Sequence, residues 1–254
     1  MVKVSAVIIT FNEEKNIERC LKSLVDVADE IIVVDSFSTD KTAAICKQYS
    51  VNFVQQEFLG YIEQKNFALS KAKYDYIIAL DGDEALSDEL KASLQKLKTN
   101  WKYDGYYANR LNNYCGQWIK HSDWYPNKKM RFFKKDAGSW QGINPHDNFI
   151  LNNPKHSGFL KGDILHWVLD DYSSHIKKTE NFSTIAAKAY YDQGKRSSIW
   201  KIIYRPAWAF FKAYILRLGF LDGLNGFIIC VQTYNTVFYK YIKLYELQKI
   251  NSKA

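Results

Sequence analysis

Apolar runs and amphipathic stretches alternate through the first hundred residues, and this alternation restricts the fold more than any other feature of the sequence. Apolar runs typical of buried strands lie at residues 4–9, 30–34 and 76–80, with a shorter run at 51–54. Stretches with apolar residues three and four apart, which are typical of helices, lie at 17–24, about 63–73 and from Ser87 onward. Strands that alternate with helices build a mostly parallel sheet with helices on both faces. We therefore expect an α/β fold.

Polar side chains follow three of the predicted strands. Asn12 and Glu13 follow the first strand, Asp35 ends the second, and Asp81-Gly82-Asp83 follows the run at 76–80. Ligands of parallel sheets bind beyond the carboxyl ends of the strands. These clusters are expected to converge on one site, although strand ends are polar in any sheet.

Asp81-Gly82-Asp83 carries the clearest chemical signal among them. Two carboxylates one residue apart at the end of a strand can share a hard divalent cation, and Mg²⁺ or Mn²⁺ prefers oxygen ligands and commonly keeps a substrate phosphate. An ordinary surface turn is the other interpretation of the same three residues.

The pattern changes twice in the rest of the chain. From Tyr103 to about Trp167 the segments are short, aromatic and interrupted by glycine, which predicts extended strands and loops. After residue 172 the pattern is helical, and Arg205-Pro206 and Gly219 are expected to break the helices. We expect one domain over residues 1–172 and a helical C-terminal extension over 173–254.

Composition restricts the function only coarsely. The formal net charge of +8 suits nucleic acid, anionic lipid or phosphorylated substrates equally well. The four cysteines lie far apart, so reduced thiols in a cytoplasmic protein are expected rather than a metal knuckle or a disulfide framework. The short apolar start lacks the cleavage site of a signal peptide, and no uncharged apolar stretch is long enough for a membrane-spanning helix.

Four segments of the first half carry a family signature. They are Ile8-Ile9-Thr10-Phe11-Asn12-Glu13-Glu14, Val33-Val34-Asp35-Ser36-Phe37-Ser38-Thr39-Asp40-Lys41-Thr42, Gln64-Lys65-Asn66-Phe67-Ala68-Leu69 and Leu80-Asp81-Gly82-Asp83-Glu84. In this order and spacing they resemble the family 2 glycosyltransferases. The resemblance implies the GT-A fold of nucleotide-diphospho-sugar transferases, with residues 1–100 as the nucleotide-sugar half and residues 101–172 as the acceptor half.

Looser matches extend the resemblance over nearly the whole chain. They are Trp124-Tyr125-Pro126, Arg131-Phe132-Phe133-Lys134-Lys135, Trp140, Pro145-His146-Asp147, Leu165-His166 and Gly219-Phe220-Leu221-Asp222-Gly223. These segments are similar to the lipopolysaccharide-core glucosyltransferases and their relatives. That group usually carries His-Glu where this chain has His146-Asp147, so the carboxylate here stands on a shorter side chain.

The resemblance implies an inverting glycosyltransferase. A sugar would pass from a nucleotide-diphosphate donor, a UDP-sugar, to a hydroxyl of a lipid-linked or lipopolysaccharide-type glycan acceptor. Asp147 is the implied general base, which takes the proton of the attacking hydroxyl. Glu84 is the other candidate for this base, and an exposed loop aspartate is the simpler interpretation of Asp147.

The resemblance also implies residues that bind the donor and a metal. Substrate contacts are implied for Thr10, Asn12, Glu13, Asp35, Asn66, Asp81 and Arg131. Asp83, with His166 as a further candidate, would bind Mg²⁺ or Mn²⁺.

Simpler explanations remain for several of these side chains. Asp35 can be a turn aspartate, and Glu13 can stabilise the start of a helix. Asn66 can lie on a helix surface, and Arg131 on a basic strand face instead of at a diphosphate or an acidic acceptor. A lone histidine beside tryptophan, such as His166, is commonly packed or capped.

Two other classes of function fit less well. A nucleotidyltransferase of related fold should carry glycine and arginine in the loop after the first strand, and residues 10–16 contain neither. A non-catalytic nucleic-acid-binding protein should gather its basic residues in a recognisable motif, and acidic strand ends would repel phosphates. No nucleic-acid partner is therefore expected.

The region from 195 to 217 predicts contact with a membrane surface. It combines six basic residues with aromatic ones and no acidic residue; the basic residues are Lys195, Arg196, Lys201, Arg205, Lys212 and Arg217. Such a region is typical of peripheral attachment, here to the cytoplasmic face of the inner membrane. Helices that pack on the catalytic domain with their lysines at the surface are the alternative. No motif selects the donor sugar or an oligomeric state.

Overall fold

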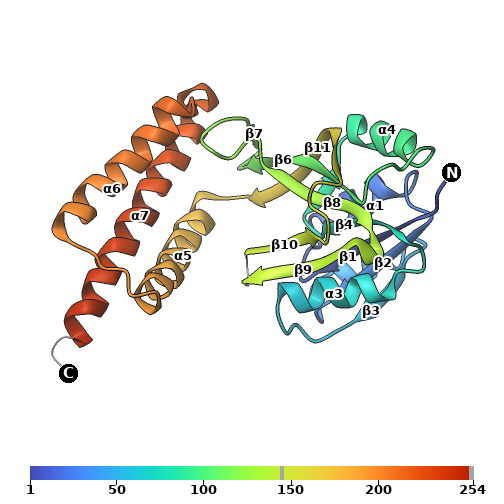
Figure 1. Ribbon diagram of the computed structural model, residues 1–254, viewed down its shortest axis with the longest axis horizontal. Coiled ribbons are helices and arrows are strands. Elements are labelled where there is room, and N and C mark those ends of the chain that lie inside the picture. Colours follow the sequence, from blue (N-terminus) through green and yellow to red (C-terminus); the bar gives the residue numbers. More distant parts are fainter. Residues whose placement is uncertain (144–145, 252–254) are drawn as a thin grey trace. The chain divides into compact units, whose positions relative to one another are not determined.

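The computed structural model describes residues 1–143 and 146–251. Clustering of contacts divides the chain into two compact units, and Figure 1 shows their elements. The first unit comprises Met1–Leu111 and Asn127–Trp167, and the second comprises Asn112–Pro126 and Val168–Ala254. The short segment 112–126 thus groups with the C-terminal helices.

The first unit is built on a large mixed sheet. In the described part of the chain the strand order is β3-β2-β1-β4-β8-β6-β11-β5; β7 belongs to the second unit and pairs with residues 112–114 of β6. The strands are β1 Val4–Thr10, β2 Glu30–Asp35, β3 Asn52–Gln55, β4 Tyr76–Asp81, β5 Glu84–Leu86, β6 Gly105–Tyr114, β7 Gln117–Ile119, β8 Lys128–Lys134 and β11 Ser157–Leu169. A separate hairpin pairs β9 Gly138–Ile143 with β10 His146–Leu151.

The sheet is parallel only where helices connect its strands. Strands β1 to β4 pair in parallel, and the helices among them are α1 Ile17–Leu24, α2 Thr42–Cys46 and α3 Tyr61–Lys71. Strands β8 and β6 add in antiparallel fashion, because the aromatic segments after residue 100 connect without crossover helices. The sheet is therefore mixed rather than mostly parallel.

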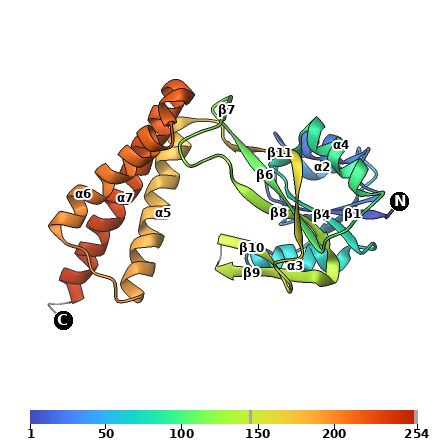
Figure 2. The same cartoon turned by 45° about the horizontal axis from the view of Figure 1, so that its top comes forward.

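Alternate residues of the central strands face two separate helical layers. Ala6 and Ile8 pack in one cluster with α1 and with α4 Asp88–Leu97. Val7 and Ile9 pack in the other cluster with α3. Figures 1 and 2 accordingly show α3 and α4 on opposite sides of the sheet. This arrangement buries both faces of β1 and directs its carboxyl end to the site described below.

Capping residues and hydrophobic patterns in the sequence predicted most of these helices and strands correctly. The Ser87 hydroxyl accepts a hydrogen bond from the Leu90 backbone N–H, as expected for the residue that caps α4. The Asp40 carboxylate accepts from the Thr42 N–H at 2.9 Å and so supports the start of α2. The region from Tyr103 to about Trp167 consists of strands and loops, as predicted, with one short 3₁₀ helix at Lys135–Ala137.

The second unit contains three helices and a sharp bend. The helices are α5 Tyr172–Asp192, α6 Ile199–Phe211 and α7 Gly223–Asn251, and α7 packs along both others. The expected break at Arg205-Pro206 is wrong, because α6 continues through Pro206. Proline costs a helix one backbone hydrogen bond, and Pro206 is buried in a helix that packs along α7.

The actual break follows the π-helical segment Lys212–Leu216, close to the predicted position Gly219. Leu218 adopts the left-handed conformation there, and a short 3₁₀ helix, Gly219–Asp222, leads into α7. The Asp222 carboxylate accepts backbone hydrogen bonds from Lys120 and His121, at 3.2 and 2.9 Å. These bonds tie the segment 112–126 to the helical unit.

Taken singly, no helix in the described residues has the length and apolar character needed to span a bilayer. The pair Ile199–Leu216 and Gly219–Ile250 meets those criteria only jointly, and it is bent by 71°.

Candidate active site

The carboxyl ends of β1, β2 and β4 surround a cavity of about 550 Å³ in the first unit. Its lining includes Thr10, Glu13, Ser36, Asp81, Gly82, Asp83 and His166, together with the aromatic residues Phe58 and Tyr61. A volume of this size is typical of small-molecule sites. Residues that end or follow all three strands therefore line one site, with Ser36 rather than Asp35 from the second strand, and we call this site the donor cavity.

Gly82 lets the loops after β1 and β4 approach closely. A Cβ atom at this position would lie 2.8 Å from Thr10 Oγ1 and 3.2 Å from Glu13 Cγ. The Thr10 hydroxyl is buried and has no hydrogen-bond partner among the described residues. A buried hydroxyl without a partner costs free energy unless a ligand satisfies it. The donor cavity thus offers a polar contact that the protein itself does not use.

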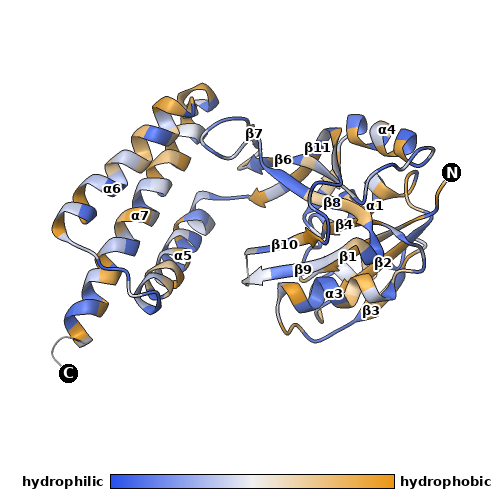
Figure 3. Cartoon of the chain, viewed as in Figure 1, coloured by the Kyte–Doolittle hydropathy of each residue, from blue (hydrophilic) through white to orange (hydrophobic). Residues whose placement is uncertain are grey.

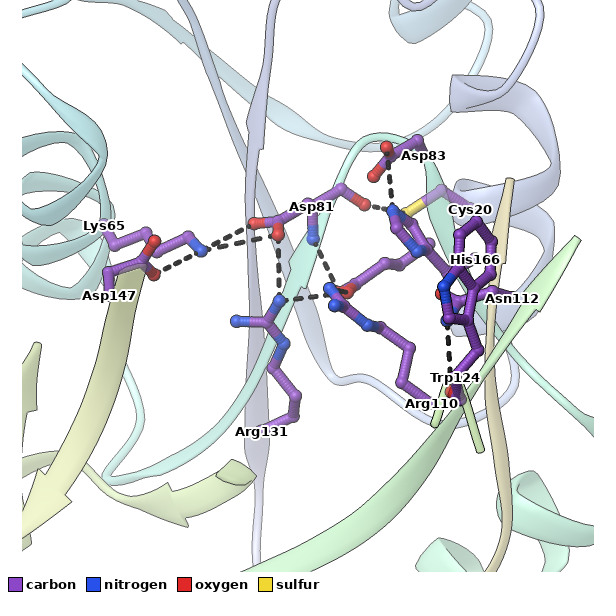
Figure 4. Close-up of polar contacts among 11 residues, drawn as sticks. Cys20, Lys65, Asp81, Asp83, Arg110, Asn112, Trp124, Arg131, Asp147 and His166 are labelled. Atoms are coloured by element: carbon purple, nitrogen blue, oxygen red, sulfur yellow. Dashed lines mark hydrogen bonds and ion pairs between the residues drawn. The ribbon is translucent and has the colours of Figure 1, made fainter. Parts of the chain in front are cut away.

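Asp83 and His166 meet at the same cavity. His166 Nε2 lies 3.2 Å from Asp83 Oδ2, and the two side chains are joined by a dashed line in Figure 4. Within the described residues no group of three or more His, Cys, Asp or Glu side chains could hold a metal ion. Mg²⁺ and Mn²⁺ commonly take one or two protein ligands and complete their shell with substrate phosphates. Asp83 with His166 fits that pattern, because a diphosphate would supply the missing oxygens.

Asp81 belongs to a different network from Asp83. Lys65 Nζ lies 3.1 Å from Asp81 Oδ1 and 2.7 Å from Asp147 Oδ2, and Arg131 Nη2 lies 2.8 Å from Asp81 Oδ2. Figure 4 shows these four side chains converging from separate elements. Arg131 also reaches Glu84 Oε1 at 2.9 Å. Lys65 and Arg131 therefore clamp Asp81 and leave Asp83 as the carboxylate suited to a metal.

Charge pairing lowers the pKa of two carboxyl groups in this network, those of Asp81 and Glu84, despite their burial. Burial alone raises the pKa of Asp81, but Arg131 and Lys65 outweigh it and hold that pKa far below its usual range. The pKa of Glu84 is likewise lowered, because Arg131 and Arg110 outweigh burial and the Asp81 charge. Glu84 is fully buried, and its Oε2 accepts from the Asp81 backbone N–H at 3.1 Å. Both oxygens of Glu84 are therefore used in contacts within the protein, to Arg131, Arg110 and the Asp81 backbone. This favours Asp147 over Glu84 as the general base.

Glu13 has the opposite electrostatic environment. The pKa of its carboxyl is raised to about 7, mainly by burial and in addition by the charges of Asp83 and Asp40, while a hydrogen bond from Asn16 opposes the rise. A bound cation at Asp83 would oppose that effect by favouring the ionised form. Glu13 lines the donor cavity, which agrees with its predicted contact to the substrate. That contact stays a prediction.

Asp35 and Asn12 shape the loops and do not line the donor cavity. Asp35 is fully buried, and both of its oxygens accept hydrogen bonds from Ser38. Asn12, at a positive φ of 53°, accepts from the Thr39 N–H at 2.8 Å. This geometry matches the turn interpretation of Asp35, and the neighbouring Ser36 lines the cavity instead.

Asn66 also holds the scaffold together. Its side chain exchanges two hydrogen bonds with the backbone of Trp140, at 3.1 and 3.2 Å, and so fastens α3 to β9. Trp140 in turn lies against the Lys65 ammonium, 4.7 Å from ring centroid to Nζ. Of the matched segment Pro145-His146-Asp147, Pro145 lies outside the described residues, and Asp147 is on β10.

A second cavity of about 310 Å³ adjoins the donor cavity. The two share Tyr61 and Asp81 in their linings. The second cavity is also lined by Lys65, Arg110, Lys129, Arg131, Trp140 and Asp147. We call it the acceptor-side cavity because the predicted base lies in it.

Lys65, Arg110 and Lys129 were missed from the sequence as site residues. The sequence does contain a signal for Lys65. It lies three and four residues before Ala68 and Leu69, on the buried face of α3 that these residues form together with Gln64. A lysine on the core side of a helix needs a buried partner, and here two carboxylates supply it.

A model of glycosyl transferase family 2 matches residues 5–155, which is more than half of the chain. The chain belongs to this family. It is therefore an enzyme of the glycosyltransferase class with the GT-A fold, and both predictions are confirmed. Family membership also favours sugar transfer over the nucleotidyltransferase and nucleic-acid-binding alternatives.

Relatives that match almost the whole of this chain support the assignment to this family. An uncharacterized glycosyltransferase of Rickettsia bellii is 33% identical over 98% of this chain and 87% of its own length. The lipopolysaccharide core biosynthesis glycosyltransferase LpsC of Rhizobium meliloti is 28% identical over 98% of this chain and 94% of its own length. The predicted similarity to enzymes of the lipopolysaccharide core is thus confirmed.

Solved structures with a similar arrangement include residues 1–349 of TarS from S. aureus in complex with UDP-GlcNAc. That structure has a TM-score of 0.47 and 16% identity, with 94% of this chain and 91% of that chain covered. Glucosyl-3-phosphoglycerate synthase from Mycobacterium tuberculosis, with Mn²⁺ and UDP-glucose, has a TM-score of 0.36 and 24% identity over 44% of each chain.

Proposed function

We propose that this glycosyltransferase moves a hexose from a UDP-sugar to a hydroxyl of a glycan or glycolipid acceptor, with inversion at the anomeric carbon. The observation that carries the proposal is the pair of adjoining cavities that meet at Asp81. One cavity has a carboxylate and an imidazole suited to a metal–diphosphate, and the other has Asp147. Opposite placement of leaving group and base is what a single inverting displacement requires.

The residues of the donor cavity have distinct proposed tasks. Thr10 and Ser36 offer hydroxyl contacts to the nucleotide, and Asp83 with His166 would hold Mg²⁺ or Mn²⁺. When bound, the ion supplies a positive charge that stabilises the departing diphosphate. Lys65 orients Asp147 through the ion pair at 2.7 Å. Asp147 then takes the proton of the acceptor hydroxyl as that oxygen attacks the sugar.

Binding of the donor nucleotide tests the proposal directly. UDP with Mn²⁺ should raise the melting temperature, because a ligand at about 100 times its Kd stabilises the folded state by about 2.7 kcal/mol. UDP alone should raise it far less, and single-stranded DNA should not raise it at all. A shift with DNA that equals the shift with UDP and Mn²⁺ would contradict a sugar-nucleotide site. GDP and CDP in parallel identify the base.

We further propose that the second unit attaches the enzyme to the cytoplasmic face of the inner membrane. Large hydrophobic side chains are exposed on α6 and after its bend, and Figure 3 shows hydrophobic positions along both α6 and α7. They include Ile199, Trp200, Ile203, Trp208, Leu216, Leu221 and Leu224. No acidic residue occurs from 193 to 221. An exposed apolar surface with basic neighbours complements an anionic bilayer.

Two of the six basic residues share one carboxylate within the unit. Lys212 Nζ and Arg217 Nε pair with Asp123, at 3.1 and 2.8 Å. The charge available to lipid headgroups therefore comes mainly from Lys195, Arg196, Lys201 and Arg205. At about 1 kcal/mol for each cation near an anionic surface, the attachment should be weak enough to reverse with salt.

Flotation with liposomes tests the attachment. We expect the enzyme to float with vesicles that contain anionic lipid at low salt and to dissociate at high salt. Trp200→Ser with Ile203→Ser should weaken flotation, because both side chains are more than half exposed. Val25→Ser, at an exposed hydrophobic residue of the first unit, is the matched control. Failure of the wild type to float at low salt would make these helices a packing or dimer surface.

A further inference from the structure

The acceptor-side cavity is basic in a way that the sugar-transfer step does not require. Four basic residues line it, Lys65, Arg110, Lys129 and Arg131, against two acidic ones, Asp81 and Asp147. A neutral sugar hydroxyl needs hydrogen-bond acceptors and a base rather than an excess of cations. The excess therefore calls for a separate explanation.

The pairing of β6 with β8 brings the basic residues together. Lys129 and Arg131 are two residues apart on β8, and Ala108 on β6 is the register partner of Lys129. Arg110 lies two residues beyond Ala108, and its backbone N–H donates to Asn127 O at 2.7 Å. The register shifts between Tyr106 and Tyr107, whose partners are Phe132 and Met130, so Arg131 is an extra residue on β8 and the alternation of side chains is interrupted there. All three cations line the acceptor-side cavity.

Ion pairs within the cluster account for three of the four cations. Lys65 pairs with Asp147 and Asp81, Arg131 with Asp81 and Glu84, and Arg110 with Glu84 at 3.3 Å. Three carboxylates thus balance three cations. Lys129 is the cation left over, since its ammonium makes no hydrogen bond or ion pair with any described residue.

Lys129 is held in a position that disfavours its own charge. Burial lowers the pKa of its ammonium, and the charges of Arg110 and Arg131 lower it further against Glu84 and Asp147. The Nε atoms of Arg110 and Arg131 are also buried without a hydrogen-bond partner among the described residues. An anion bound beside Lys129, Arg110 and Arg131 would relieve the repulsion among these cations and could accept hydrogen bonds from them.

We propose that the acceptor-side cavity binds an anionic oxygen group of the acceptor, a phosphate or a carboxylate, with Lys129 as the cation that selects it. The inference rests on the proposed function, since it takes the adjoining donor cavity for the nucleotide sugar. It narrows the substrate class from any glycan to one that carries a negative charge near the reacting hydroxyl. Arg110 supports the same anion from the neighbouring strand.

A matched pair of variants on β8 isolates Lys129. Lys129→Gln removes the unpaired charge, whereas Lys128→Gln removes the charge of an exposed neighbour whose ammonium lies over the Phe159 ring, 5.7 Å from its centroid. Lys129→Arg keeps the charge and is the conservative variant. Removal of a repelled charge should not lower the melting temperature, so loss of folding does not obscure the result.

The probes are inorganic phosphate, glucose 6-phosphate, glucuronic acid and glucose, titrated by ligand-observed NMR into protein saturated with UDP and Mg²⁺. We expect at least one charged probe to bind, glucose to bind at least tenfold more weakly, and the charged probe to lose tenfold or more in affinity in Lys129→Gln. Lys128→Gln and Lys129→Arg should match the wild type. The stronger of glucose 6-phosphate and glucuronic acid identifies phosphate or carboxylate as the group.

Two outcomes would overturn the proposal. Equal binding by Lys129→Gln and the wild type would remove Lys129 from the site. Loss of phosphate binding once UDP is present would show that the cluster holds the diphosphate of the donor. Failure of UDP and Mg²⁺ to bind at all would instead count against the proposed function, and phosphate titration of the free protein would still decide the role of Lys129.

Discussion

Asp83→Ala should lower the metal-dependent affinity for a UDP-sugar by about 100-fold or more, because Mg²⁺ and Mn²⁺ commonly rely on one or two carboxylates beside the substrate phosphates. Of Asp81 and Asp83, Asp83 is the carboxylate that forms no ion pair with Lys65 or Arg131. Its side chain is about a quarter exposed, at 26%, so the substitution leaves no buried cavity. Calorimetric titration with UDP-glucose, with and without Mn²⁺, measures the effect.

Two further variants make the Asp83 result specific. Asp88→Ala removes an exposed acidic side chain at the start of α4 and should leave donor affinity unchanged. His166→Gln separates the two interpretations of the imidazole, since a ligand would lose metal-dependent affinity and a packed side chain would not. Undiminished Mn²⁺-dependent binding in Asp83→Ala would assign the metal to other residues.

The sequence was sufficient to predict the layers of the first unit. Strands β1 to β4 pair in parallel and are joined by helices, so each of these elements shows its own period, and Ser87 caps α4. The strands after residue 100 were predicted as extended but not in their order. Their pairing brings β8 beside β4 and β6 beside β8, which depends on contacts that local patterns do not encode.

The candidate site also contains residues that the sequence could predict and residues that only the fold reveals. Strand-end residues such as Thr10 and Asp83 follow from the position of their strands, and the structure brings them to one cavity. Asp35 and Asn66 occupy motif positions, yet their hydrogen bonds are made to the protein's own loops. Lys65 lies on the buried face of its helix, which signals a buried partner, but the partners of Lys65 and Arg110 lie on distant elements and follow only from the fold.

The buried charge network has a physical consequence for any substitution within it. Removal of one partner from a buried pair is costly, by about 3–5 kcal/mol, because it leaves an uncompensated charge. Arg131 and Glu84 are both almost fully buried, so alanine variants of either would unfold the site before they reported on chemistry. Isosteric replacements are therefore the informative ones in this cluster.

Asp147→Asn is such a replacement, and it should lower turnover by about 100-fold or more while donor affinity stays unchanged, since loss of a general base usually costs about 10²–10⁴ in rate. An asparagine oxygen can still accept from Lys65, and Lys65 keeps its contact with Asp81 at 3.1 Å. The side chain thus loses its ability to take a proton but keeps its place. Release of UDP from UDP-sugars, with purified membrane glycolipids as acceptors, measures turnover.

Asp147→Glu provides the control for that result. The lipopolysaccharide-core group that this chain resembles usually carries glutamate at the corresponding position, so a carboxylate one methylene longer should retain part of the activity. A structural role for Asp147 predicts the reverse order, because asparagine preserves the shape of the side chain and glutamate does not. Near-normal turnover in Asp147→Asn would therefore show that Asp147 only anchors Lys65, 2.7 Å away, and that the proton leaves through another group of the acceptor-side cavity.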